Sequence, residues 1–165
     1  MFFLRPPSLP ALMVGLLLFT GCGLFGSDDP DTALALGTMK AQIDGKDWEA
    51  VNATANRVFV GGLTQVTITG ATIQAEGISF SLTDTGPGSY TIDDQVDPAR
   101  DVLSASYTRS IGQTYLAQSG ALEITRFDEE AVEGSFSFEA RNTSGQVVSV
   151  TNGSFRVGYG PSIGS

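Results

Sequence analysis

Carboxylates are the groups in this 165-residue chain that could do chemistry, and they gather in two short segments. The first segment holds Asp93, Asp94, Asp97 and Asp101, which are candidate ligands for Ca²⁺ because that cation takes about six to eight oxygen ligands. The spacing does not match an EF-hand and the run contains no glycine, so a solvated acidic loop is the competing interpretation. Residues 128–133 form the second segment, which could offer the paired carboxylates of a glycosidase. We expect this segment to form a hairpin tip, where no cleft would raise a pKa.

The residue types that are missing limit the enzyme classes further. The chain has no histidine and a single cysteine, Cys22. Triads that need histidine, most zinc sites and the usual general base at neutral pH are therefore excluded. We expect a protein that is not an enzyme, and a hydrolase that uses carboxylates alone remains the enzymatic alternative.

Two aromatic side chains are candidates for stacking against a ligand. Trp48 could do so, although its large apolar surface also suits the core. Tyr115 lies in the weakly patterned segment 111–117, so we expect its ring to be exposed.

The elements that would position these groups are strands, because apolar residues alternate with polar ones from Thr38 onward. Met39, Ala41 and Ile43 begin the pattern, and Asp44-Gly45 predicts a tight hairpin turn. No run of helical length is amphipathic. The pattern predicts roughly nine to eleven short strands, joined by connections that favour antiparallel neighbours. We therefore expect a single all-β domain over residues 38–160, an antiparallel meander forming a β-sandwich or a flattened up-and-down barrel, with a short tail at 161–165.

Finer expectations concern glycines and strand ends. Gly70 predicts a bulge or bend, with the strand continuing beyond it through Ile73 and Ala75. Residues 111–117 predict a short strand of their own. The Gly-Ser-aromatic sequence occurs three times, and we expect each copy to start a strand with its ring turned inward: Gly88-Ser89-Tyr90, Gly134-Ser135-Phe136 and Gly153-Ser154-Phe155.

The N-terminus has the pattern of an export signal. Arg5 precedes an apolar run over residues 11–19, which is shorter than the ~20 residues needed to cross a bilayer. Phe19-Thr20-Gly21-Cys22 resembles the bacterial lipobox, which implies a signal peptide at 1–21 and a palmitate-type lipid anchor on Cys22. An ordinary secretory signal with a free thiol is the alternative.

Residues 22–37 are predicted to be a flexible acidic tether between the lipidated cysteine and the domain. Gly23 stands where aspartate is linked with retention in the inner membrane, so we expect an anchor in the outer membrane. Residues 27–31 resemble acidic signals that send Bacteroidota lipoproteins to the cell surface, although a solvated spacer would look the same. The formal net charge of −9 argues against binding nucleic acid.

Three segments resemble a family of uncharacterised Bacteroidota-type lipoproteins. Its opening motif is similar to Ala41-Gln42-Ile43-Asp44-Gly45-Lys46-Asp47-Trp48-Glu49-Ala50, and its closing strands to Gly134-Ser135-Phe136-Ser137-Phe138-Glu139-Ala140 and Val150-Thr151-Asn152-Gly153-Ser154-Phe155. The resemblance covers roughly residues 40–159. It implies an all-β envelope domain and brings no catalytic residues.

These observations predict a non-enzymatic outer-membrane lipoprotein that binds a ligand or a partner, with an unknown protein or a glycan as the candidate. A structural or assembly subunit of an envelope complex is the alternative from another class. No cofactor is expected apart from the lipid on Cys22, with Ca²⁺ at the Asp93 cluster as the exception to test.

Overall fold

The computed structural model describes residues 33–60, 63–83, 86–93 and 102–160, and they form ten β-strands without a helix. The strands are β1 (Thr38–Ile43), β2 (Lys46–Glu49), β3 (Asn52–Val60), β4 (Leu63–Ala71), β5 (Gly77–Thr83), β6 (Gly88–Asp93), β7 (Val102–Ser110), β8 (Gln113–Phe127), β9 (Ala131–Arg141) and β10 (Val147–Gly158). Within these residues there is no helix that is long and apolar enough to cross a membrane.

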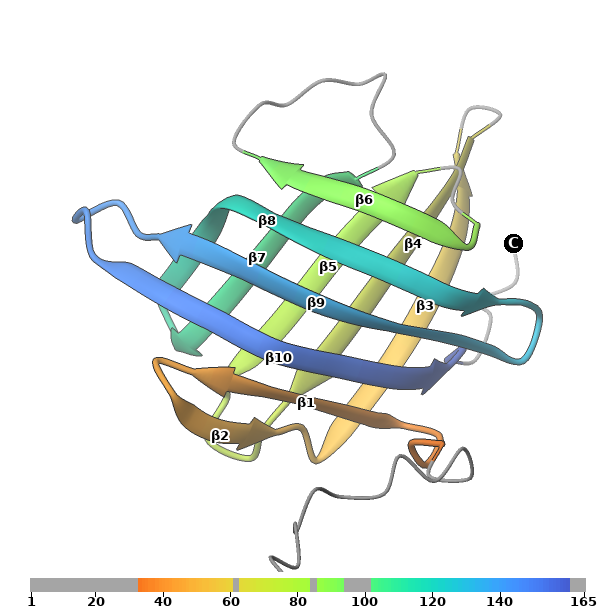
Figure 1. The fold of residues 1–165 in the computed structure, drawn as a ribbon, viewed down its shortest axis with the longest axis horizontal. Helices are drawn as coiled ribbons and strands as arrows, with labels where there is room; N and C mark the ends of the chain where they lie inside the picture. The colour runs from red at the N-terminus through yellow and green to blue at the C-terminus, as the bar shows by residue number, and fades with distance from the viewer. Residues whose placement is uncertain (1–32, 61–62, 84–85, 94–101, 161–165) are drawn as a thin grey trace, which may run out of the picture. The chain divides into compact units, whose positions relative to one another are not determined.

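All strand pairs in the sheet are antiparallel, in the order β2-β1-β10-β9-β8-β7-β5-β4-β3. Strand β6 leaves this path and pairs with the second half of β8, whereas β7 pairs with the first half. The sheet therefore folds over along β8 into two layers that cross steeply, β3-β4-β5-β7 behind and β6-β8-β9-β10-β1 in front (Figure 1). The predicted all-β antiparallel fold is confirmed, with two departures from a simple meander. Strand β6 is displaced onto β8, and β1 pairs with β10, so that the consecutive strands β2 and β3 stand at opposite ends of the strand order.

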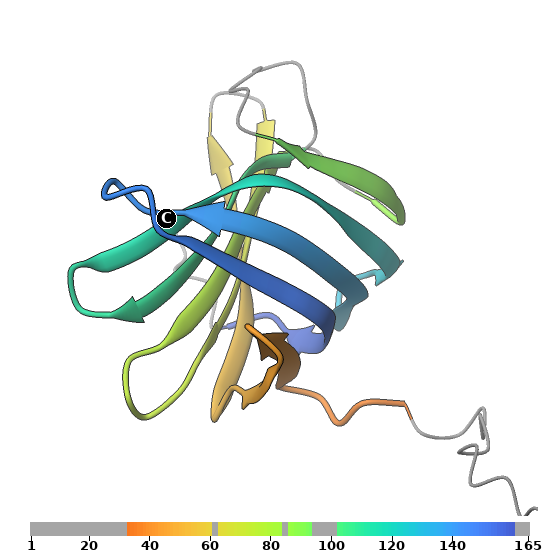
Figure 2. The same cartoon turned by 60° about the vertical axis from the view of Figure 1, so that its left-hand side comes forward.

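The open side of the curled sheet almost closes, because β3 approaches the last strand. Ala55 bridges Tyr159, and the Gly160 N–H donates to the Ala55 carbonyl at 2.8 Å. Figure 2 shows the curl from β8 into β7. The result lies between a sandwich and a half-barrel.

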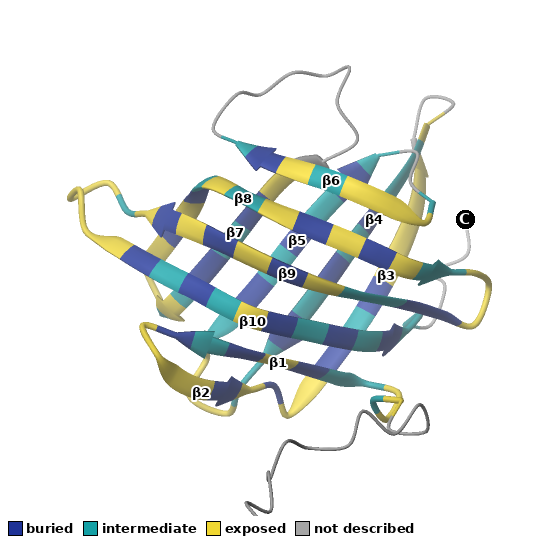
Figure 3. Cartoon of the chain, viewed as in Figure 1, coloured by how far each residue is buried: buried dark blue, intermediate teal, exposed yellow. Residues whose placement is uncertain are grey.

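The core lies between the two layers, and buried residues alternate with exposed or half-buried ones along the strands (Figure 3). Its centre is a group of four phenylalanines. Phe80 comes from the back layer, and its ring centroid lies 4.9 Å from that of Phe136, 5.9 Å from Phe138 and 6.5 Å from Phe155. No polar or charged residue is buried in the described part of the chain. The interior is therefore apolar and packed, and a ligand site must lie at an end or on a surface.

Two Gly-Ser-aromatic sequences lie inside strands, which corrects the prediction that they start them. Gly134 in β9 is the register partner of Phe155 in β10, and Gly153 in β10 is the partner of Phe136 in β9. A Cβ on Gly134 would lie 2.9 Å from Phe155 Cζ, and one on Gly153 would collide with the Phe136 ring. Each ring thus covers the glycine of the neighbouring strand, and only Gly88 begins a strand as predicted.

The expectations for two other segments were also wrong. Gly70 pairs regularly within β4 and is needed for close packing, because a Cβ there would lie 2.6 Å from Met39 Sδ. Ile73 and Ala75 lie in the turn between β4 and β5, with Ala75 at φ 62°. Ile111 and Gly112 form a turn. Residues 113–117 are in a strand as predicted, but they begin the 15-residue β8 instead of forming a short strand of their own.

Candidate functional site

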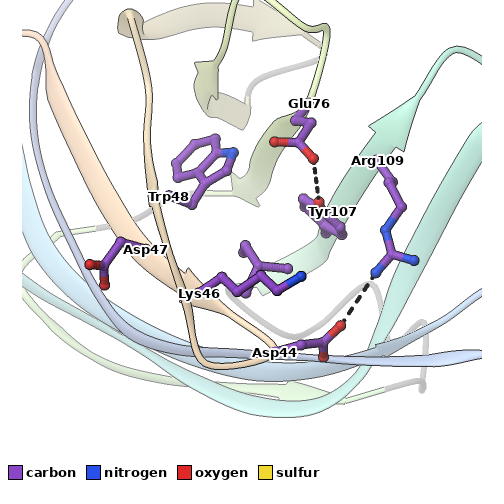
Figure 4. A pocket seen from close by; sticks show the side chains of 8 residues that line it. Asp44, Lys46, Asp47, Trp48, Glu76, Tyr107 and Arg109 are labelled. Atoms are coloured by element: carbon purple, nitrogen blue, oxygen red, sulfur yellow. Dashed lines mark hydrogen bonds and ion pairs between the residues drawn. The ribbon is translucent and has the colours of Figure 1, made fainter.

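A polar pocket of about 430 Å³ opens at one end of the sandwich. The β1–β2 hairpin of one layer forms one wall, and the β4–β5 turn with the end of β7 forms the other (Figure 4). The lining residues are Ile43, Asp44, Lys46, Asp47, Trp48, Glu76, Tyr107 and Arg109.

The hairpin wall is built by a turn that the sequence dictates. Asp44 and Gly45 adopt φ values of 50° and 76°, the left-handed conformation that a two-residue type I′ hairpin needs. Asp44 Oδ1 accepts a hydrogen bond of 3.0 Å from the Ser149 N–H, which fixes the turn against β10. Trp48 is the register partner of Ala41, a small residue that leaves room for the indole. The turn thereby sets the place of Lys46 and Trp48.

The facing wall carries a hydrogen-bonded tyrosine and an arginine. The Tyr107 hydroxyl donates to Glu76 Oε1 at 3.2 Å, and Arg109 Nη2 lies 3.3 Å from Asp44 Oδ2 across the pocket. Burial raises the pKa of Tyr107 above its ordinary value; Arg109 counteracts part of this rise and the charge of Glu76 adds to it. Tyr107 therefore stays protonated and can donate at neutral pH.

Among the described residues that line the pocket, Trp48 has a buried hydrogen-bond donor without an acceptor. Its side chain is 6% exposed, and its Nε1 is buried without a hydrogen-bond partner. Figure 4 shows this nitrogen turned toward the space between Glu76 and Tyr107. A buried donor without an acceptor costs about 1–3 kcal/mol. Nε1 itself is covered by its neighbours, so a ligand acceptor would remove that cost once a shift of the lining side chains lets it reach the nitrogen.

Two further groups are available to a ligand. Lys46 has no ion-pair partner among the residues that the structure describes. The Arg109–Asp44 pair is partly exposed on both sides, and exposed pairs contribute only about 0–1 kcal/mol. A ligand can therefore open this pair at little cost.

A family model described as Domain of unknown function (DUF6252) matches residues 36–157. The protein belongs to the DUF6252 family. The match runs from just before β1 to the penultimate residue of β10, so the whole pocket lies inside the DUF6252 domain. Membership of an uncharacterised family is thus confirmed. A search of curated proteins and a search of solved structures found no match.

The expectation that the Tyr115 ring is exposed was wrong. Its side chain is only 1% exposed, and its ring centroid lies 6.0 Å from that of Tyr107. The Arg109 guanidinium carbon lies 5.2 Å from the Tyr115 ring centroid. Tyr115 therefore packs behind the Tyr107 and Arg109 side chains that line the pocket of the DUF6252 domain. Trp48 offers the pocket an N–H and not an open ring face.

Most of the predicted calcium cluster and the lipidation site lie outside the described residues. This holds for Cys22, Asp94, Asp97 and Asp101. Asp93 is the last residue of β6, where it is half-buried and stands in register with Ser119. Among the described residues, no group of three or more acidic, histidine or cysteine side chains could hold a metal.

The acidic hairpin tip at 128–133 has a structural use. Asp128 Oδ1 accepts hydrogen bonds from the backbone N–H groups of Glu130 (2.8 Å) and Ala131 (3.0 Å). Arg126 forms ion pairs with Asp128, Glu130 and Glu133. The hydrogen bond from Arg126, followed by the two backbone hydrogen bonds, lowers the pKa of Asp128 to about 2. Asp128 therefore holds the turn of the tip and is ionised at neutral pH.

The Asp128→Asn variant should be less stable than the wild type, and the difference should depend on pH. Asparagine keeps an oxygen for the turn but cannot pair with Arg126. A lowered carboxyl pKa stabilises the fold above the unfolded value of 3.8, and this contribution is lost as the pH falls to about 2. Urea midpoints should therefore differ by a constant amount from about pH 7 to pH 5 and converge toward pH 2. A difference that does not change with pH would contradict this role.

The sequence did not predict the other pocket residues as a group. Glu76, Tyr107 and Arg109 come from segments far from Asp44 in the chain, and each has an ordinary place in a turn or strand. The Asp44-Gly45 turn was the one available signal, because it put Lys46 and Trp48 on a defined hairpin. Lys46 and Lys40 are exposed, as the expected hairpin implied.

Proposed function

We propose that the protein is a non-enzymatic, lipid-anchored envelope module that binds a small polar ligand in the pocket at the end of its sandwich. The observation that carries this proposal is the buried Trp48 N–H, which lacks an acceptor and faces the pocket. Pockets that bind small molecules are concave and largely preformed, and a few polar groups orient the ligand. The hairpin, the β4–β5 turn and β7 provide such a rigid frame here.

The anchor in this proposal rests on the sequence. The tetrad ending at Cys22 resembles the lipobox, and three segments of the domain resemble uncharacterised Bacteroidota-type lipoproteins. Gly23 after Cys22 favours the outer membrane, and the acidic residues 27–31 favour display on the cell surface. The tether of residues 22–37 would hold the pocket within reach of ligands near the membrane.

A binding role is supported over catalysis by the state of the pocket carboxylates. Asp44 pairs with Arg109, and Glu76 accepts from Tyr107. The chain has no histidine to move a proton at neutral pH. These groups are suited to holding hydroxyl or amino groups of a bound molecule.

The Trp48→Phe variant should lose affinity while keeping its fold. Phenylalanine keeps an aromatic ring but removes the N–H, so the dissociation constant should rise about three- to tenfold. The detergent-solubilised protein would be screened by saturation-transfer NMR against simple sugars, free amino acids and dipeptides, and the ligands found would be titrated by calorimetry. Lys40→Met on the same hairpin is the control, because Lys40 pairs with Glu49 and does not line this pocket. Equal affinity in Trp48→Phe and the wild type would count against this site.

A subunit role in an envelope complex is the second candidate, and exposed apolar residues on the β3–β4 hairpin favour it. Phe59 is 74% exposed, and Val58 and Leu63 are also exposed beside it. If the ligand screen gives no binding and the protein sediments as part of a larger envelope complex, this function replaces the first.

A further inference from the structure

We infer that the ligand of the Trp48 pocket is a neutral saccharide, either a free hexose or the terminal unit of a neutral glycan. This inference rests on the proposed binding function and names the chemical class of the ligand. Three observations support it: the balance of charge in the pocket, its mixture of donors and acceptors, and the exposed isoleucines in two turns that adjoin pocket residues.

The balance of charge disfavours ligands with a net charge. The Glu76 carboxylate has a neutral partner, since the Tyr107 hydroxyl donates to it. Asp47 turns its carboxylate to the other side of the hairpin, where Gln42 Nε2 donates to it at 3.2 Å. Lys46 offers one positive charge, and Arg109 is offset by Asp44. The charges of Asp44, Lys46, Glu76 and Arg109 therefore cancel, and an anion would still be repelled by a chain of net charge −9. A simple cation would leave Lys46 and the Trp48 N–H without an acceptor.

The mixture of donors and acceptors matches hydroxyl groups. The Trp48 N–H and the Lys46 ammonium need acceptors, whereas the Glu76 carboxylate accepts. A hydroxyl group both donates and accepts, so a polyhydroxylated molecule meets both needs without carrying charge. These three groups come from the hairpin and from a turn on the facing wall. Hydroxyls spread around a sugar ring fit that distribution better than an amino acid, which carries its ammonium and carboxylate on one carbon.

Apolar side chains stand at the same end of the molecule. Ile73 is 80% exposed in the turn that carries Glu76, and Ile111 is 93% exposed in the turn that follows β7 and Arg109. A sugar ring has C–H faces as well as hydroxyl edges. A polar pocket whose walls continue into turns with exposed isoleucines therefore suits a ligand of this mixed character.

The experiment compares ligands that differ in one group. The detergent-solubilised full protein is titrated with glucose, galactose, mannose, maltose and cellobiose, with glucuronate as the charged counterpart of glucose, and with glycine, alanine and glutamate. We expect at least one neutral sugar to bind, and its acidic counterpart to bind at least about tenfold more weakly. Affinity for the neutral sugar should change less than about twofold between 50 and 500 mM NaCl, because no net charge is buried.

Variants of pocket residues show whether the sugar binds in the Trp48 pocket, and a check of their fold separates lost binding from unfolding. Trp48→Phe and Lys46→Met should each lower the affinity for the neutral sugar about three- to tenfold. Lys40→Met should leave this affinity unchanged. Circular dichroism of each variant checks that the β-fold is intact. Lys46 is exposed, so its replacement should not disturb the core.

The outcomes separate this inference from the proposed function. Binding of amino acids without sugars, or tighter binding of glucuronate than of glucose, overturns the saccharide inference but leaves a ligand pocket. If no probe binds at 10 mM, the saccharide inference and the proposed binding function are both overturned. Sugar binding that Trp48→Phe and Lys46→Met leave unchanged places the site elsewhere and also overturns the inference.

Discussion

Replacing Phe80 with alanine is expected to lower the free energy of unfolding by about 3–5 kcal/mol. The Phe80 ring is fully buried in β5 and contacts three phenylalanines of the opposite layer, with Phe136 nearest at 4.9 Å. Its removal would leave a cavity between the two layers. Domains of this size are stable by about 5–15 kcal/mol, so the loss would be a large part of the total. Urea denaturation followed by circular dichroism measures it.

Phe59→Ala is the matched control for Phe80→Ala. It removes the same ring from β3 in the same layer, but the Phe59 side chain is exposed. Its effect should stay within about 0.5 kcal/mol. Similar losses for the two variants, or a loss below about 1 kcal/mol for Phe80→Ala, would mean that the four-phenylalanine group does not hold the layers together.

The Cys22→Ser variant should lose its acyl label completely. Serine provides no thiol for the anchor, and buried acyl chains contribute about 0.8 kcal/mol per CH₂ to membrane binding. Cells grown with labelled palmitate would be compared for label on the wild-type and variant chains, and intact-mass spectra would show the lipid on the wild type. Cys22 is the only cysteine, so no other thiol can take its place.

Ser27→Ala in the acidic tether is the control for the Cys22 variant, and it should keep both the label and the mass. Label that persists in Cys22→Ser, or a wild-type chain without lipid, would remove the basis for an outer-membrane anchor. The pocket could still bind its ligand in that case.

The strands could be predicted because alternation is a local property, and Asp44-Gly45 could be predicted as a turn because its residue types suit left-handed conformations. The burial of Tyr115 could not be predicted from the sequence. Ile111 and Leu116 are apolar yet exposed, so they hide the alternation that would have placed Tyr115 inside. The environment of a ring on β8 depends on β7 and β9, which the segment itself does not encode.

The pocket was beyond sequence reasoning for a similar reason. It forms where the β1–β2 hairpin meets Glu76 and Arg109 from the other layer, and that meeting depends on how the sheet folds over along β8. The displacement of β6 to β8 is part of the same fold and leaves no mark in the alternation. A donor without an acceptor, such as the Trp48 N–H, can be recognised only when its surroundings are known.

The paired glycines and phenylalanines of β9 and β10 have a consequence for how the chain avoids misfolding. If β10 slipped by two residues along β9, each ring would face a side chain where it now faces bare backbone at Gly134 or Gly153. Such a slip keeps the inward and outward faces of the strands, so hydrophobic patterning alone would tolerate it. The two glycines therefore favour the native register of β9 and β10 over a register shifted by two residues.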